Sequence, residues 1–245
     1  MKRTSKYISF LLIIAILLFF TNSCMMKVIK APENRKRLEF LKEKILKYND
    51  SINSFKGEGY AILRNGKDTK TFRVDITFVN NFENYRILIK DFVFQNPLVL
   101  LIKEKNDVLL YDYIKREKTS FPDISAIFNR ILKFNLPQGN IFVKTLGLRI
   151  PVLENINPKL IDSNSLEYDA GNIKETVYIN GELPDKIIYL SKDAKMVIKY
   201  DKPLKINERN LPTKILIKIG DTSLEVNYKK VQINGDFSSD IKIVK

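Results

Sequence analysis

Long stretches of this chain alternate between apolar and polar residues with a period of two, and no other feature limits the fold as strongly. In residues 71–78 the apolar side chains all fall on one face: Phe72, Val74, Ile76 and Phe78. The next apolar run repeats the alternation with Tyr85, Ile87 and Ile89. Strands with one apolar and one polar face belong to antiparallel sheets that bury a single face. The sequence therefore predicts antiparallel meander strands.

Asparagine–glycine pairs mark turns between these strands. Asn65-Gly66 and Asn180-Gly181 are examples, and this dipeptide is the strongest short signal for a hairpin. Between such turns we expect strands near 58–64, 71–78, 85–89, 99–103, 108–114, 165–170, 174–180, 185–191, 195–200, 213–219 and 222–231. The mature chain is long enough to bury one sizeable core, so we expect a single domain over residues 34–245.

An amphipathic helix is predicted before the first strand. Asn34 can cap its start, and it runs to about Tyr48. Its apolar face holds residues at spacings of three, four and seven: Leu38, Leu41, Ile45 and either Leu46 or Ile52. This helix either closes one side of the sheet or forms a lid over a cavity.

Two further helices are predicted in the centre of the chain. The first begins after Asp123 as its N-cap, and its apolar face is Ile124, Ile127, Phe128, Ile131 and Leu132. The second runs from about Gln138 to Leu146 with Gly147 as its stop, and its apolar side is Ile141, Phe142 and Leu146. Both helices are expected to turn these faces toward the sheet.

The N-terminal segment resembles a bacterial lipoprotein signal. Basic residues precede an apolar run from Tyr7 to Phe20, which is shorter than the roughly 20 residues that a membrane-spanning helix needs. The segment ends at Cys24, the only cysteine. We expect residues 1–23 to be removed, Cys24 to carry the lipid, and residues 24–33 to form a tether. An ordinary cleaved signal and a short uncleaved anchor are the alternatives.

Composition excludes several classes of function. The chain has no histidine and no tryptophan, which removes Ser-His-Asp and Cys-His nucleophiles and the commonest metal ligand. No carboxylate cluster has metal-ligand spacing and no glycine-rich phosphate loop is present. We therefore expect no enzyme, no cofactor and no metal, with a lysine-based or paired-carboxylate enzyme as the remaining alternative. Without a free second cysteine, the domain folds without disulfides.

The chain is strongly basic, with a net charge of +14 that falls to +11 when Lys2, Arg3 and Lys6 leave with the signal. The lysines are spread along strands and loops, without a basic cluster interleaved with aromatic residues or a helix-turn-helix spacing. We therefore expect no nucleic acid partner, and at most a weak attraction to anionic lipid headgroups.

The connection at residues 91–98 departs from the usual composition of a turn. Phe92, Phe94 and Leu98 surround an Asn-Pro pair, although a turn tip normally collects Gly, Asn, Asp and Ser. Apolar side chains there either fold back into the core or face a ligand or a membrane.

The order of these elements resembles the LolA/LolB lipoprotein-localisation family, and its LolB-like members most closely, over roughly residues 34–234. Four segments carry the resemblance: Gly57-Glu58-Gly59, Asn96-Pro97-Leu98, Leu136-Pro137 through Leu146-Gly147, and Leu211-Pro212-Thr213-Lys214-Ile215. The family's tryptophans are missing, and Val99 replaces the glycine that usually follows Pro-Leu. The resemblance implies a mainly β (α+β) fold: an incomplete, strongly curved antiparallel β-barrel with an N-terminal helix and two short central helices covering a hydrophobic cavity.

The resemblance also implies a function. A monomer anchored through Cys24 to the outer membrane, facing the periplasm, would receive lipoproteins from a LolA-like periplasmic carrier and insert them into the membrane. Met25 in place of an aspartate agrees with the outer membrane, and the inner membrane and the cell surface are alternatives. The acyl-binding cavity would be lined by Phe72, Val74, Ile76, Phe78, Ile87, Ile89, Ile127, Phe128, Ile131 and Phe142.

The transfer loop would hold Phe94, Pro97 and Leu98, with Leu98 at the tip of a turn. We expect Leu98→Glu to leave folding intact and to block insertion of lipoproteins. A carrier of other lipids or glycolipids on the same fold, and a surface lipoprotein that binds a protein partner, are the competing functions.

Overall fold

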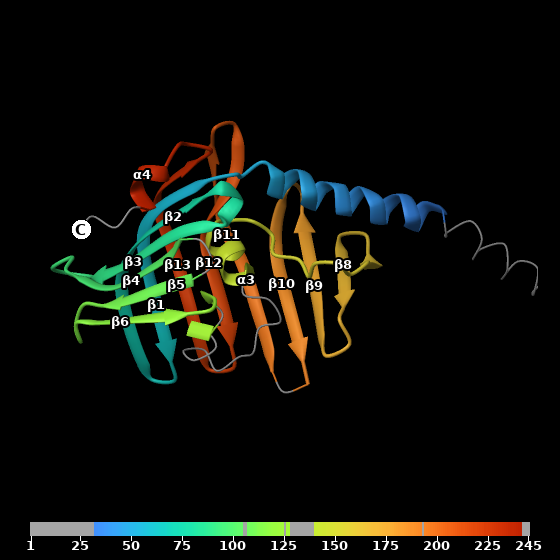
Figure 1. Cartoon of the computed structure of the whole chain (residues 1–245). Coiled ribbons are helices and arrows are strands. Elements are labelled where there is room, and N and C mark those ends of the chain that lie inside the picture. The colour runs from blue at the N-terminus through green and yellow to red at the C-terminus, as the bar shows by residue number, and fades with distance from the viewer. Residues whose placement is uncertain (1–31, 105–106, 125, 128–139, 193, 242–245) are drawn as a thin grey trace, which may run out of the picture.

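The computed structural model describes residues 32–104, 107–124, 126–127, 140–192 and 194–241. Within these residues, thirteen antiparallel strands form one sheet in the order β6-β5-β4-β3-β2-β1-β13-β12-β11-β10-β9-β8-β7. The first strand pairs with the last one along the chain, so the two halves of the sheet meet at β1 and β13. The sheet curves strongly around a short central helix and stays open, with β6 and β7 as its two edges (Figure 1). The predicted incomplete barrel is confirmed.

The strands have the following bounds: β1 Phe55–Asn65, β2 Asp68–Val79, β3 Asn84–Asp91, β4 Pro97–Glu104, β5 Asp107–Asp112, β6 Glu117–Phe121, β7 Lys159–Asp162, β8 Ser165–Asp169, β9 Ile173–Asn180, β10 Leu183–Ser191, β11 Lys195–Ile206, β12 Arg209–Ile219 and β13 Thr222–Ile233. A 3-10 turn, η1, covers Asn80–Phe82 between β2 and β3. Short helices α3 and α4 cover Asn140–Leu146 and Ser238–Ile241.

Alternation along most of the strands sends apolar side chains to the concave face of the sheet. Buried and more exposed positions alternate along β9, for example. The strand register then places Val177, Ile187, Ile198 and Ile217 in one row across four neighbouring strands. All four are buried, and the row forms part of a single core that spans the concave face.

The structure extends or adds strands where the sequence shows little alternation. Strands β6 and β7 were not predicted; each is short, mostly exposed and lies at an edge of the sheet. Strands β11 and β12 continue past Pro203 and Pro212, which lie opposite each other in the register. Because proline usually ends a strand, these two residues obscured the full length of the hairpin.

The N-terminal helix covers residues 32–50 and crosses the ends of β9 and β10 in Figure 1. It includes Pro32 and Asn34, so Asn34 is not its cap and the helix takes in the end of the predicted tether. Leu41 and Ile45 are buried against the core, as predicted. Of the two candidates for the last apolar position, Ile52 is buried and Leu46 is exposed. No helix in the described ranges is long and apolar enough to cross a bilayer.

The first central helix begins at residue 124, where the Asp123 carboxylate accepts a hydrogen bond from the Ala126 backbone N–H at 3.0 Å. This geometry confirms Asp123 as an N-cap. Ile124 and Ile127 are buried. The remaining predicted residues of its apolar face, which include Phe128 and Ile131, lie outside the described residues.

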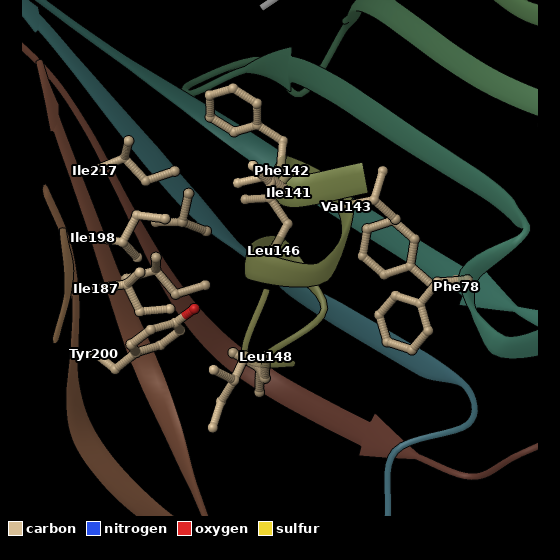
Figure 2. Close-up of a cluster of buried hydrophobic side chains, with 14 of the residues drawn as sticks. Phe78, Ile141, Phe142, Val143, Leu146, Leu148, Ile187, Ile198, Tyr200 and Ile217 are labelled. Atoms are coloured by element: carbon tan, nitrogen blue, oxygen red, sulfur yellow. The ribbon is translucent and has the colours of Figure 1, made fainter. Parts of the chain in front are cut away.

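The second central helix, α3, lies in the hollow of the sheet, and its apolar side chains point at the strands (Figure 2). Gly147 follows it for a reason other than the predicted one. A Cβ atom at Gly147 would lie 1.8 Å from Cε1 of Phe82, so a close approach requires the glycine. The left-handed residue that ends the helix is Leu148, with a φ of 65°.

Candidate functional site

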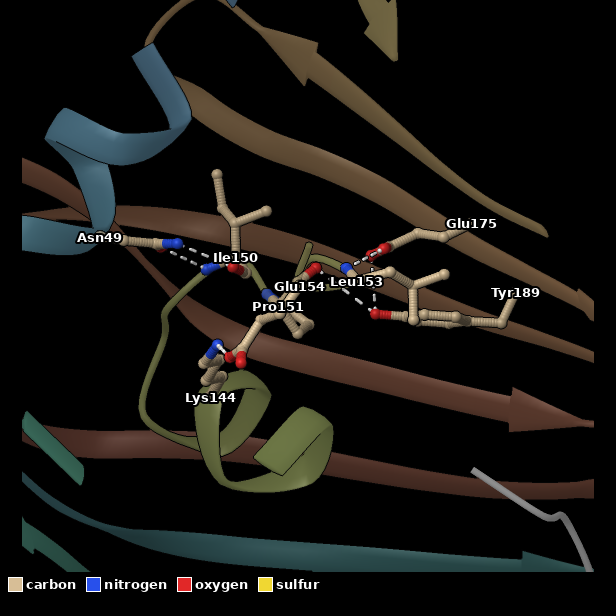
Figure 3. Close-up of polar contacts among 8 residues, drawn as sticks. All are labelled: Asn49, Lys144, Ile150, Pro151, Leu153, Glu154, Glu175 and Tyr189. Carbon is tan, nitrogen blue, oxygen red and sulfur yellow. Dashed lines mark hydrogen bonds and ion pairs between the residues drawn. The ribbon is translucent and has the colours of Figure 1, made fainter. Parts of the chain in front are cut away.

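The chain after α3, residues 147–154, crosses the concave face as a strap. Side chains of the sheet and of the N-terminal helix hold its backbone. The hydroxyl groups of Tyr48, Tyr200 and Tyr228 donate to the carbonyl oxygens of Leu148, Arg149 and Leu146, at 2.9, 3.3 and 2.6 Å respectively. The Asn49 amide exchanges two hydrogen bonds of 2.8 Å with the backbone of Ile150 (Figure 3). The strap is therefore fixed by side-chain hydrogen bonds.

Arg149 fixes the other side of the strap. Its Nε donates to the Ile52 carbonyl oxygen at 2.7 Å, and its Nη2 donates to Oδ1 of Asn81 at 3.1 Å. The guanidinium carbon lies 4.3 Å from the centre of the Phe82 ring. Burial lowers the pKa of Arg149. A buried cation with these partners joins the strap, the end of the N-terminal helix and the β2–β3 connection.

A buried carboxyl group meets the far end of the strap. Glu175 lies on β9, and its Oε2 accepts a hydrogen bond from the Leu153 backbone N–H at 2.6 Å. The Tyr189 hydroxyl donates to Glu175 Oε1 at 2.8 Å (Figure 3). Burial raises the pKa of Glu175 from 4.5 to about 8. The group therefore stays protonated in the folded protein at neutral pH.

The Glu175 pKa predicts a pH dependence of stability. Because the folded-state pKa is above the unfolded value, the contribution is complete below pH 4.5 and is lost as pH rises to about 8. We expect Glu175→Gln to remove this component from the difference in unfolding free energy between pH 5 and 8.5, measured with urea. Glu167→Gln, on the neighbouring strand β8, serves as the control and should keep the dependence of the unchanged protein. Equal pH dependence in both variants would contradict the assignment.

Most of the predicted acyl-binding residues are buried. Val74, Ile76, Phe78 and Ile87 of β2 and β3, Ile127 of the first central helix and Phe142 of α3 belong to one packed core. In this structure these residues and α3 pack together on the concave face. The concave face is as apolar as predicted, but α3 fills its centre. A role of these six residues in binding acyl chains stays a prediction.

On β2–β6, one part of the concave face is only half-buried. We call it the concave strip: Phe72, Ile89, Val99, Leu110 and Phe121. Ile89 and Val99 are direct partners in the register of β3 and β4. All except Phe72 pack against the margin of the core. The sequence singled out Phe72 and Ile89, whereas the alternation of the later strands did not show which of their faces is concave.

Two neighbouring turns expose apolar side chains at the end of β3–β6. We call this group the apolar tip: Phe92, Val93, Phe94, Tyr113 and Ile114. Val93, Phe94 and Ile114 are 70, 78 and 73% exposed. The Tyr113 backbone N–H donates to the Leu98 carbonyl oxygen at 3.0 Å, so the β3–β4 and β5–β6 turns lie side by side, and both project at the left of Figure 1.

An aspartate organises each of these turns in the same way. Asp91 Oδ1 accepts hydrogen bonds from the backbone N–H groups of Val93 and Phe94, at 2.9 and 2.7 Å. Asp112 Oδ1 accepts from the N–H groups of Ile114 and Lys115, both at 3.0 Å. Such Asx turns satisfy the backbone locally, so the apolar side chains between them are free to point into solvent.

The predicted transfer loop is placed differently from the expectation. Phe94 is at the tip of its turn and Pro97 is exposed, but Leu98 is the second residue of β4 and is half-buried. Pro97 already pairs with Lys90 of β3, so the turn has ended before Leu98. Cys24 lies outside the described residues. Among the residues that are described, no cluster of acidic or cysteine side chains has the arrangement of a metal site.

Comparison with known proteins supports the fold assignment. The sequence matches no protein-family model and no curated protein. Among solved structures, a DUF1329 family protein from Desulfovibrio piger has a TM-score of 0.58 and 9% identity, over 85% of this chain and 97% of its own. An outer-membrane lipoprotein-sorting domain from Vibrio parahaemolyticus has a TM-score of 0.57 and 10% identity, with the same coverage of both chains. A LolA superfamily protein from Nitrosomonas europaea has a TM-score of 0.52 and 12% identity, over 82% of this chain and 97% of its own. The chain has the open β-barrel fold of LolA-like proteins.

Proposed function

We propose that this protein binds the acyl chains of lipidated cargo on the concave strip and passes them to a membrane at the apolar tip. The observation that carries the proposal is that β3–β6 bring both features together. Ile89 precedes the turn residue Asp91 by two positions, so the strip leads directly to the tip. The shared fold with a LolA superfamily protein and a lipoprotein-sorting domain supports the same function.

The concave strip has the properties that an acyl chain needs. Its side chains are apolar and half-buried, and they follow one another across neighbouring strands. Burial of apolar surface contributes about 25 cal/mol per Å², and a C16 chain gains on the order of 10 kcal/mol in gross transfer. A chain that reaches the buried residues of β2 and β3 in this core must move α3 and its strap. Release into water is unfavourable by the same amount, so cargo has to leave directly into a bilayer.

The apolar tip provides this route. Large apolar side chains on two adjacent turns gain nothing from contact with water, whereas a membrane interface offers them an apolar environment. Each buried side chain of this size contributes about 1.5–3 kcal/mol. The turns therefore hold the mouth of the concave strip against the bilayer while the chain moves.

An anchor at Cys24 would keep the domain near its target membrane. The helix is described from residue 32, and a segment from Cys24 to that residue spans at most roughly 30 Å when extended. We propose the outer membrane as the site of the anchor, a LolB-like receptor role there, and a LolA-like carrier as the donor of cargo. The lipid attachment and removal of residues 1–23 belong to the same proposal.

Two adjacent leucines on β5 test the binding face. Leu110 belongs to the concave strip and pairs with Leu101 of β4. Leu109 points to the other face of the sheet and pairs with Ile102. Both are half-buried. We expect Leu110→Gln to weaken binding of a fluorescent palmitoylated peptide about tenfold or more, because an apolar contact worth roughly 1.5–3 kcal/mol is lost. Fluorescence anisotropy measures the dissociation constant. Leu109→Gln should change it little, and equal effects of the two variants would refute the concave strip as the binding face.

A further inference from the structure

A second hollow lies at the rim of the sheet, outside the concave strip. It has a volume of about 520 Å³ and lies between the N-terminal helix, the turn that connects β9 to β10 and the start of β12. Residues of the helix line one side, and Glu182 of the β9–β10 turn and Arg209, Asn210 and Leu211 of β12 line the other. We call it the rim groove.

The helix presents a separate stripe of side chains to the rim groove. Phe40, Lys44, Lys47 and Ser51 follow one another at intervals of three and four residues, so they share one side of the helix. The neighbouring stripe contains Leu41 and Ile45, which are buried in the core. The helix thus packs on the core through the stripe of Leu41 and Ile45, and the neighbouring stripe lines the open rim groove.

The rim groove combines an apolar floor with an excess of cations. Phe40 is 50% exposed and Tyr48 is half-buried, so an acyl chain in the groove covers aromatic surface, whereas Leu211 is buried. Three cations, Lys44, Lys47 and Arg209, line it together with two carboxylates, Glu43 and Glu182.

The hydrogen-bond partners of these cations do not neutralise their charge. Lys44 Nζ contacts the Gly181 carbonyl oxygen, and Arg209 Nη1 donates to the Ser51 carbonyl oxygen at 3.3 Å. Both cations therefore bind neutral groups. In the described part of the chain, Lys47, Glu43 and Glu182 form no ion pair. The groove keeps a net positive charge beside its apolar floor.

We propose that the rim groove binds an amphiphile with one acyl chain and a phosphate-bearing headgroup. The chain covers Phe40 and Tyr48, and the phosphate lies near Lys47 and Arg209. This charge complementarity selects an anionic headgroup, because a neutral amphiphile leaves the excess positive charge of the groove uncompensated. The site is separate from the concave strip and does not depend on transfer of cargo.

Isothermal titration calorimetry with palmitoyl-lysophosphatidylglycerol, below its critical micelle concentration, tests the proposal. The titration uses the full chain carrying Leu110→Gln, so that the concave strip contributes little. We expect saturable binding, and we expect Phe40→Ser and Lys47→Gln each to weaken it about fivefold to tenfold. Leu46→Ser and Lys36→Gln are matched controls, because both residues are exposed on the same helix and neither lines the groove. Neither control should change the affinity.

Two further titrants separate the chemistry of the headgroup from that of the chain. Inorganic phosphate and monopalmitoylglycerol should each bind at least tenfold more weakly than the lysophospholipid. The inference is overturned if the neutral amphiphile binds equally well, if Phe40→Ser and Leu46→Ser have the same effect, or if Leu110→Gln alone abolishes binding. The last result would place the lipid on the concave strip, and it would therefore leave the proposed function standing.

Discussion

Replacing Phe94 and Ile114 with glutamate is expected to stop delivery of acylated cargo into membranes while binding of that cargo continues. Both side chains lie on the apolar tip, in two adjacent turns, and each is more than 70% exposed. Contact of each wild-type side chain with the bilayer contributes about 1.5–3 kcal/mol, so their loss weakens docking by roughly a hundredfold to ten-thousandfold. A carboxylate at the same place adds a further penalty. Transfer of a fluorescent palmitoylated peptide from the protein to lipid vesicles gives the rate.

A matched double variant distinguishes this effect from a general change in surface charge. Leu190 and Leu204 are also large, exposed apolar residues, but they lie on β10 and β11, away from the tip. Leu190→Glu with Leu204→Glu introduces the same two charges and should transfer cargo at the normal rate. Unfolding curves of both variants should match that of the unchanged protein. A slow rate in the control pair, or a normal rate in the tip pair, would contradict the role of the apolar tip.

The second large effect concerns the strap, and it is a loss of stability. Arg149→Met keeps most of the side-chain volume but removes the hydrogen bonds to the Ile52 carbonyl and to Asn81, together with the contact over the Phe82 ring. Hydrogen bonds to a charged group contribute about 1.5–3 kcal/mol, and the carbonyl is left without this partner. We expect a loss of about 3 kcal/mol, which corresponds to a fall in Tm of roughly 6–12 °C for a domain of this size.

Calorimetry measures this change, and Arg64→Met provides the comparison. Arg64 lies on β1, and its side chain is 43% exposed beside Glu225, where an ion pair contributes little. Its replacement should lower Tm by a few degrees at most. A similar Tm for the two variants would show that the strap is held without Arg149. A lower Tm for Arg149→Met, with cargo binding retained at low temperature, would assign the strap to stability.

The strands that the sequence predicted well are those that bury one face. Strand β9 alternates over its whole length, and its predicted and observed bounds differ by one residue. Strand β6 has polar residues on both faces at the edge of the sheet, so it carries no periodic signal. The far ends of β11 and β12 were not predicted for a different reason. Each contains a proline, and the pairing of Pro203 with Pro212 is visible only once the whole hairpin is formed.

The candidate site was less accessible to prediction from the sequence. An unusual apolar turn that holds Phe92 and Phe94 was recognised, but the second half of the tip, Tyr113 and Ile114, comes from the next hairpin. The two turns meet because β4 pairs with β5, and the local sequence pattern does not predict this pairing. The contacts that hold the strap could not be predicted from local pattern either. Alternation placed Tyr189 and Glu175 on strands, but not the hydrogen bond that joins them.

Filling of the concave face by α3 also could not be read from the sequence. The helix itself was predicted, together with the apolar side that it turns to the strands. Whether such a helix covers an empty hollow or packs into it depends on the curvature of the sheet and on the strap that holds it. The difference matters for function, because the side chains of the concave strip on β2–β6 are half-buried and therefore partly accessible.

Photocrosslinking tests the central claim that this strip holds the acyl chain. A palmitoyl chain with a diazirine near its middle is bound to the full-length protein, activated by light, and the modified residues are identified by mass spectrometry of peptides. We expect adducts concentrated on the concave side of β2–β6, at or beside Phe72, Ile89, Val99, Leu110 and Phe121. Adducts found only at the rim groove or at the apolar tip, with none on these strands, would contradict it.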